Sequence, residues 1–330
     1  MKPFLRNNLP GLLLALLIAG LAYLFGRLVP VVGGAVFGIT LGILVATLWK
    51  LPAATGQGIK FTSKYVLQLA VILLGFDMNM ANIIKVGRAS LLVLLVTLSV
   101  AFTVAYFAGK ALKVERKLAT LIGVGTAICG GSAIAAASTA IDAQDQEISY
   151  AISTIFLFNV IAVFLFPAVG HLLKLTDTGF GMWAGTAIND TSSVVAAGFS
   201  YSDAAGNFAT IVKLTRSLMI VPVTLALALL FSKDGKNGGQ FNFAKVFPWF
   251  ILGFLAAAVL SSLPLLPAIV TADLAWTGKF LIIAAMSAIG LNTNLRSFIK
   301  AGPKALLLGA GTWFAVAASS LAIQFLAQIR

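Results

Sequence analysis

The sequence predicts an all-α membrane protein that crosses the lipid bilayer many times. Of the 330 residues, 60% are hydrophobic and only 10% are charged. The mean hydropathy is +1.01, and long uncharged runs alternate with short polar segments. A soluble domain does not need so many uncharged runs, whereas each run suits a helix surrounded by lipid. The predicted fold class is therefore a polytopic helical membrane protein with about eleven transmembrane helices.

The apolar ranges indicate one transmembrane domain over residues 1–330. A helix needs roughly 20 apolar residues to cross the hydrocarbon core, and eleven ranges come close to that length. They are 10–26, 31–49, 61–76, 88–109, 118–140, 147–173, 180–199, 207–231, 245–263, 274–291 and 304–327. We expect two related halves, at about 31–173 and 180–330.

The basic residues indicate how the chain is oriented. It has 23 Lys and Arg against 10 Asp and Glu, a net charge of +13. Because most of the basic residues fall in short loops, the positive-inside rule explains them better than a nucleic-acid partner does. The bias predicts a cytoplasmic (inner) membrane protein with the N-terminus inside and the C-terminus outside. In this arrangement the acidic loop 142–147 lies outside and Lys174 lies inside.

Two apolar segments are rich in glycine. GVGTAICGGSAIAAASTAI (123–141) is followed by GTAINDTSSVVAA (185–197), and 125–137 matches 185–197 at seven of thirteen positions. Glycine costs about 1 kcal/mol relative to alanine inside a helix. A broken helix is tolerated in a bilayer only beside protein or water, and paired breaks are typical of transporter binding sites. We expect breaks near 125–132 and 185–193 in two discontinuous helices that cross.

A longer repeat predicts inverted symmetry. Residues 75–92 align with 290–307, and seven of the eighteen positions are identical. One copy begins at the end of the predicted span 61–76 and the other at the end of the span 274–291, seven spans later. The two copies therefore face opposite sides of the membrane, as an inverted repeat requires. The two glycine-rich segments are only two spans apart and would point the same way. Either one half is permuted, or an intervening segment does not cross.

Three motifs carry a resemblance to a known family. GTAICGGSAIAA (125–136), AIDAQDQEISYAIS (140–153) and GTAINDTSSVVAAG (185–198) resemble the YeiH-type family of proposed sulfate exporters, and the match extends from the first span to the last. More distantly, GFDMN (75–79) is similar to the bile-acid/sodium symporter superfamily. The resemblance implies two crossed discontinuous helices at the substrate site. It also implies alternating access between a core and a panel domain.

Lys213 and Arg216 lie three residues apart in a predicted span, hence on one face of a helix. Ionisable residues inside a span are candidates for functional sites. Together they could cradle a tetrahedral oxyanion. The alternative is that both snorkel to the outer interface.

Asp190 lies beside Asn189 in the second glycine-rich segment. A carboxylate next to unwound backbone can bind and release a proton or Na⁺, so Asp190 is the candidate coupling site. The alternative is a salt bridge to Lys213 or Arg216 that only makes the buried charges tolerable, and both can hold.

Other candidate ligands come from the same segments. Amides at the start of a half-helix attract anions, although small residues also permit close helix crossing. The substrate candidates here are Thr126, Gly130, Gly131, Ser132, Thr186, Asn189, Thr191 and Ser192. Four residues near the ends of the inverted repeat could bind Na⁺ or simply cap helices: Asp77, Asn79, Asn292 and Asn294.

These observations predict a secondary active transporter of a small anion, a sulfate-like oxyanion or organosulfonate. Proton coupling is favoured over Na⁺ coupling, and a cation/proton antiporter centred on Asp190 is the alternative. With one His and one Cys, we expect no enzyme activity, metal site or cofactor. No ATP-binding loop is present, so gradients must supply the energy. A homodimer is left open.

Overall fold

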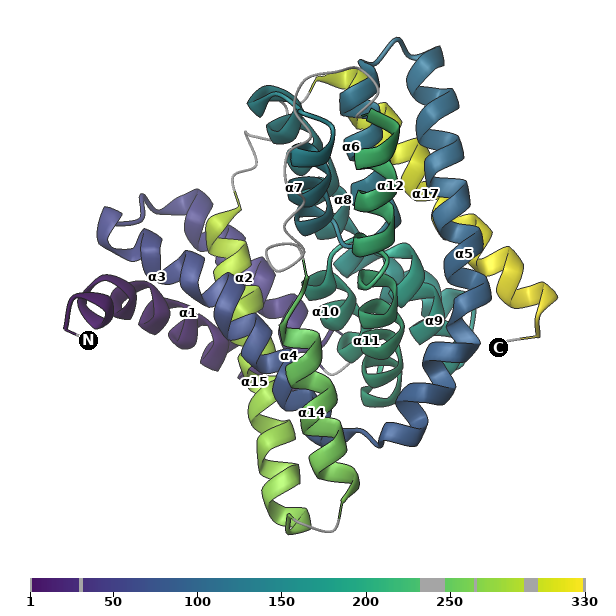
Figure 1. Cartoon of the computed structure of the whole chain (residues 1–330). Helices are drawn as coiled ribbons and strands as arrows, with labels where there is room; N and C mark the ends of the chain where they lie inside the picture. Colours follow the sequence, from purple (N-terminus) through teal and green to yellow (C-terminus); the bar gives the residue numbers. More distant parts are fainter. Residues whose placement is uncertain (1, 30–31, 232–246, 264–265, 294–301, 329–330) are drawn as a thin grey trace.

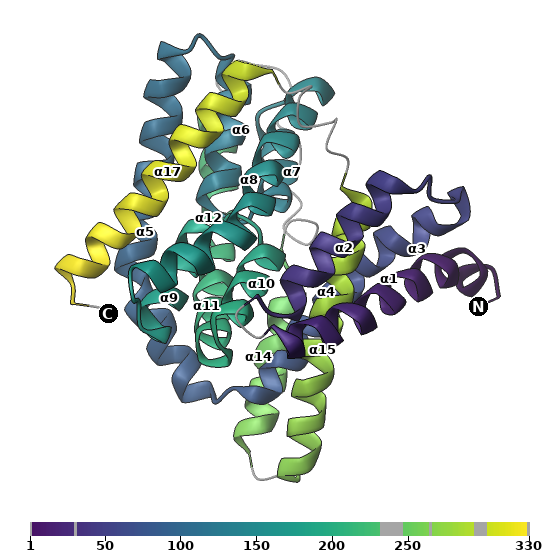
Figure 2. The ribbon, with the colours of Figure 1, turned by 180° about the vertical axis from the view of Figure 1, so that it is seen from behind.

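The computed structural model describes residues 2–29, 32–231, 247–263, 266–293 and 302–328, which are mostly helical and contain no strand (Figures 1 and 2). Seven helices in these ranges are long and apolar enough to cross a membrane. Two shorter apolar helices are Gly34–Leu48 and Phe250–Ser262. The prediction of a multi-pass helical membrane protein is confirmed, whereas the eleven crossings are not.

N-terminal helices and two later helices form what we call the first lobe, residues 2–29, 32–77, 247–263 and 266–293, on the left of Figure 1. Glycines let α2 and α15 approach closely, since a Cβ on Gly42 would lie 2.4 Å from Ser287 O. The elements are α1 (Lys2–Leu28), α2 (Gly34–Leu48), η1 (Ala53–Thr55), α3 (Gly56–Phe61), η2 (Thr62–Val66), α4 (Leu67–Leu74), η3 (Gly75–Asp77), α14 (Phe250–Ser262) and α15 (Ala268–Asn292).

The remaining helices form the hairpin lobe, residues 80–231 and 302–328, on the right of Figure 1. The lobes meet where α10 packs against α2 and α15 through small and aliphatic side chains, including Val195, Ala196, Val36 and Met286. The elements are α5 (Met80–Ala111), α6 (Arg116–Ala127), α7 (Gly131–Ala140), α8 (Asp145–Leu172), α9 (Asp177–Ala187), α10 (Thr191–Tyr201), α11 (Asp203–Ser217), α12 (Ile220–Phe231) and α17 (Pro303–Leu326).

The ranges 118–140 and 180–199 were each expected to cross as one span, and the structure corrects both. In the first hairpin, α6 and α7 pack side by side, and Lys117 at the start of α6 donates to Asp142 O after α7. In the second, formed by α9 and α10, Ser202 Oγ donates to Asp177 Oδ1 at 2.6 Å. Each half-helix has 10 to 12 residues, or roughly 15–18 Å, about half a bilayer core.

The hairpins enter from opposite sides because the whole of α8 lies between them in the chain. We call the side that carries residues 49–52 and 112–115 the Lys50 side, and the other the Asp77 side. The loop 141–144 lies with the base of the first hairpin on the Lys50 side, and the loop 173–176 lies on the Asp77 side. Both loops therefore change sides relative to the eleven-span expectation.

As single spans, the two glycine-rich segments would point the same way, which conflicts with an inverted arrangement. The reversal of the chain within each segment removes this conflict. With both segments folded back, their links point toward each other. The repeat 75–92 and 290–307 is only partly described, because residues 294–301, and with them Asn294, lie outside the described residues. In the first copy, η3 ends at Asp77 and α5 begins at Met80. The inverted repeat itself stays a prediction.

Cysteine labelling tests the two hairpins. In a Cys129→Ala background, which removes the chain's only cysteine, cysteines at the exposed positions Lys113 and Asp142 should react with an impermeant maleimide from one side of the membrane. Cysteines at Lys174 and Asp203, also exposed, should react from the other side. Labelling of positions 113 and 142 from opposite sides would contradict the first hairpin and show that 118–140 crosses the membrane as one span.

Candidate functional site

The two hairpin tips are joined by one buried lysine. We call residues 128–130 the first link and residues 188–190 the second link; each separates the half-helices of its hairpin. Lys213 on α11 has no exposed surface. Its Nζ donates to Ile128 O at 2.6 Å, to Ile188 O at 3.2 Å and to Asn189 O. All three ammonium hydrogens therefore have acceptors, taken from both links.

Arg216, one turn further along α11, makes the same connection. Its Nε donates to Ala127 O at 2.7 Å, its Nη1 to Ile188 O at 3.1 Å, and its Nη2 to Thr126 O. These carbonyls end α6 and α9, where helices carry unsatisfied acceptors and partial negative charge. We call Lys213 and Arg216 the clamp.

The contacts of the clamp bear on both interpretations of Lys213 and Arg216, the anion cradle and snorkelling to an interface. Lys213 and Arg216 are 0% and 1% exposed, and they lie about 15 and 20 Å along the helical segment that starts at Asp203. They therefore do not snorkel to an interface. In this arrangement both cations bind backbone carbonyls, and the anion cradle stays a prediction.

A cavity of about 310 Å³ lies between the lobes, on the other side of the links. The hairpin lobe supplies the first turns of α7 and α10 together with α8, and the first lobe supplies η2, α4, α14 and α15. Its polar lining residues are Ser63, Lys64, Gln68, Gly131, Ser132, Asn159, Asp190, Thr191, Ser192 and Asn292. Five of the predicted site residues thus share one cavity: Gly131, Ser132, Asp190, Thr191 and Ser192.

The start of α7 is the part of this lining best suited to an anion. Gly130 has φ +67°, a left-handed conformation that favours glycine, and no side chain caps the helix. The first helical bond runs from Ile134 N to Gly130 O, so the amides of Gly131 and Ser132 have no acceptor within the helix. Uncapped amides at the positive end of a helix form an anion site.

Asn159 on α8 gives this region a second, independent donor. The side chain is only 3% exposed and lines the cavity. Its Oδ1 accepts from Asp190 N at 3.2 Å, which fixes the orientation of the amide. This hydrogen bond does not use Nδ2 as a donor, so this group is available to a polar ligand in the cavity. Sequence reasoning missed Asn159, because a lone Asn in an apolar span has no motif around it.

The start of α10 is already occupied by a carboxylate. Asp190 is the N-cap of α10, and its Oδ2 accepts from Ser192 N at 2.9 Å and from Ser192 Oγ. Among the described residues, ion pairs within 4.0 Å form only at Lys279, so Asp190 has no salt bridge to Lys213 or Arg216. The two half-helices therefore differ: α10 carries its own anion, whereas α7 does not.

Lys64 is the one cation among the described residues that line this cavity. It lies in η2, a π-helical turn in the middle of the 53–77 segment, and its side chain is exposed. Such turns are frequent at functional sites because they change the direction of side chains. The predicted span 61–76 contains Lys64, but sequence reasoning did not single it out, since a π-turn has no distinct sequence pattern.

The remaining candidates lie elsewhere. Thr186 pairs with Ser320 at 2.6 Å and so ties α9 to α17 away from the cavity. The Thr126 hydroxyl and both polar atoms of the Asn189 side chain are buried at the tips without a partner. Of the Na⁺ candidates, Asn79 caps α5 and Asp77 binds Lys279, while Asn292 lines the cavity.

Comparison with known proteins gives the family. The chain matches, over residues 10–309, the family described as Conserved hypothetical protein 698. The chain belongs to this family. A UPF0324 membrane protein of Streptococcus pyogenes is 48% identical, covering 96% of this chain and 97% of the relative. Another, from Fusobacterium nucleatum, is 44% identical over 97% of this chain and 98% of its own length. These names specify a membrane protein and no substrate, so the resemblance to the sulfate exporters and bile-acid symporters stays a prediction.

Within this family member, the clamp should dominate stability. Arg216→Ala and Lys213→Ala each remove three hydrogen bonds, but Ile188 O keeps the bond from the other clamp residue, so two carbonyls lose their donor in each variant. Each buried carbonyl left without a donor costs about 1–3 kcal/mol. Thermal unfolding of the purified protein should therefore shift strongly downward for both variants. Arg88→Ala and Lys304→Ala remove exposed side chains of the same types and should leave the midpoint unchanged. A midpoint for Arg216→Ala and Lys213→Ala equal to these controls would show that the clamp is dispensable.

Proposed function

We propose that this protein is a secondary active transporter of a small anion. The carrying observation is the uncapped start of α7, which lines a cavity between two lobes. In a bilayer, free backbone amides are tolerated only where protein or a water-filled path satisfies them. An anion held there would satisfy them and would lie at the boundary between two bodies that can move relative to each other.

The lining favours a compact oxyanion, either sulfate-like or an organosulfonate. Its donors are backbone amides, the hydroxyls of Ser132 and Thr191, and the amide of Asn159, which suit several oxygens arranged around one centre. Lys64 at the edge of the cavity attracts such an anion electrostatically. A volume of about 310 Å³ leaves room for the anion with water or a short organic substituent.

Alternating access follows from the two hairpins. They enter from opposite sides, and the clamp joins their tips, so the hairpin lobe can move as one body against the first lobe. Where α10 packs against α2 and α15, the interface between the lobes consists mainly of small and aliphatic side chains, which favours sliding at this contact. Two discontinuous segments meeting near the midplane are typical of inverted-repeat transporters. The charge bias favours the Lys50 side as cytoplasmic, with the N-terminus inside and the C-terminus outside.

A proton on Asp190 would provide the coupling. Its carboxylate lines the same cavity as the proposed anion site, so the ionised group repels an anion and the protonated group does not. Proton and anion then favour each other's binding, by the same free energy in both directions. This predicts proton–anion symport. The alternative is a cation/proton antiporter centred on Asp190, which is favoured by Asp190 being the single carboxylate in the described part of that lining.

Filling the start of α7 tests the anion site. A Cβ on Gly131 would meet no heavy atom within 4 Å, so Gly131→Val should fold normally while its side chain occupies space beside the free amides. Uptake of radiolabelled sulfate or a sulfonate into proteoliposomes should fall roughly tenfold, or about 1.4 kcal/mol. Gly311→Val on α17 is the matched control, since its Cβ also meets nothing. Equal uptake by the two variants would show that the anion does not bind at the start of α7.

Neutralising Asp190 tests the coupling. Asn caps helices as well as Asp does, so Asp190→Asn should keep α10 intact. Anion binding should persist in this variant but lose its pH dependence, and accumulation of the anion against its gradient should stop. Normal pH dependence and uphill transport in Asp190→Asn would place coupling at another group. Proton-driven cation flux without anion flux in the wild type would favour the antiporter.

A further inference from the structure

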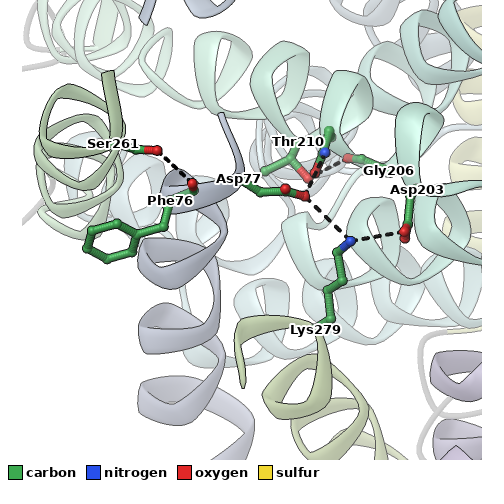
Figure 3. Close-up of polar contacts among 8 residues, drawn as sticks. Phe76, Asp77, Asp203, Gly206, Thr210, Ser261 and Lys279 are labelled. Atoms are coloured by element: carbon green, nitrogen blue, oxygen red, sulfur yellow. Dashed lines mark hydrogen bonds and ion pairs between the residues drawn. The ribbon is translucent and has the colours of Figure 1, made fainter. Parts of the chain in front are cut away.

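A charged cluster joins the two lobes on the Asp77 side. Lys279 on α15 lies between Asp77, at the end of η3, and Asp203, at the start of α11 (Figure 3). Its Nζ is 3.4 Å from Asp77 Oδ2 and 3.0 Å from Asp203 Oδ2. Asn207 Nδ2 donates to Asp77 Oδ2 at 3.0 Å. We call these four residues the latch.

Each lobe supplies two members of the latch. Asp77 and Lys279 belong to the first lobe, and Asp203 and Asn207 belong to the hairpin lobe. The ion pair from Lys279 to Asp203 and the hydrogen bond from Asn207 to Asp77 therefore both cross the boundary. Lys279 Nζ also lies 5.6 Å from the ring centre of Phe199 on α10, a third contact across the boundary. Separating the lobes here would break all three.

The latch lies at the opposite end of the lobe boundary from the cavity. Lys64, at the cavity, precedes Asp77 by 13 residues of continuous helical segment, and Lys279 precedes Asn292, also at the cavity, by 13 residues of α15. At 1.5 Å per residue, each separation is about 20 Å. The cavity therefore extends toward the Lys50 side, and the latch closes the Asp77 side.

We propose that the latch is the gate on the Asp77 side: it holds the lobes together there, and it opens when the cavity becomes accessible from that side. This inference rests on the proposed transport function. The exposed fractions of the side chains fit such a role, at 30% for Lys279, 35% for Asp77 and 73% for Asp203. Exposed pairs are weak and screened by salt, so the latch biases the closed state without fixing it.

Ser200 on α10 provides a direct reporter of this gate. Its Oγ donates to Val32 O of the first lobe at 2.7 Å, and the side chain is only 5% exposed. It lies one residue before the end of α10, near the latch end of the boundary. A cysteine at this position would react with a water-soluble maleimide only when the lobes separate on the Asp77 side.

The experiment measures the labelling rate of Ser200→Cys in a Cys129→Ala background, in nanodiscs. Adding Lys279→Met should raise the rate roughly two- to fivefold, the range expected for losing one exposed ion pair. Raising the salt concentration should accelerate labelling with Lys279 present and have little effect without it. Lys85→Met is the matched control, since this exposed lysine lies on the same side and has no ion pair among the described residues.

A double variant separates pairing from general loosening. If Lys279 and Asp203 act together, Asp203→Asn combined with Lys279→Met should label more slowly than the product of the single effects predicts. The proposed gate would be contradicted by a labelling rate with Lys279→Met equal to that with Lys85→Met. It would also be contradicted if the effects of Lys279→Met and Asp203→Asn on the labelling rate simply multiplied in the double variant. The readout does not depend on transport. Failure of the wild type to carry any anion would therefore contradict the proposed function while leaving the labelling result to decide the gate.

Discussion

The structure depends on the contact between two buried cations and the carbonyl ends of two short helices. In apolar surroundings, α6 and α9 could not end at mid-depth unless their last carbonyls found donors. Lys213 and Arg216 supply six hydrogen bonds from one face of α11. The cations in turn gain partners at the negative ends of two helices, which offsets the cost of burying them without a carboxylate.

The clamp also determines the chemistry on the other side of the links. Because α6 and α9 end on the cations, α7 and α10 begin facing the cavity, so both present their positive ends to it. Asp190 neutralises the end of α10 from within the chain, while α7 starts at Gly130 with no side-chain cap. The site therefore contains one internal anion, at the start of α10, and one uncapped helix start, at α7, an asymmetry that suits the proposed proton-linked anion carrier.

The two polar clusters are built for different tasks. The clamp is fully buried and connects segments within one lobe, so it suits a permanent joint. The latch is partly exposed, connects the two lobes and lies about 20 Å from the cavity along two helices. Weak, solvated contacts at the boundary between the lobes and strong, buried contacts within the hairpin lobe suit the proposed alternating access.

The sequence by itself determined the class, a multi-pass helical membrane protein, and it drew attention to the two glycine-rich segments, because hydropathy and glycine content are local properties. It also placed Lys213 and Arg216 on one helical face. The tertiary structure alone decided that 118–140 and 180–199 turn back, since two half-helices together have the length and hydropathy of one span. The chain can reverse at Ile128 because Lys213, 85 residues away, satisfies its carbonyl. The same reversal places Lys213 and Arg216 on backbone carbonyls. It also brings Asn159 and Lys64 to the predicted residues at the start of α7, which is possible only when distant segments pack.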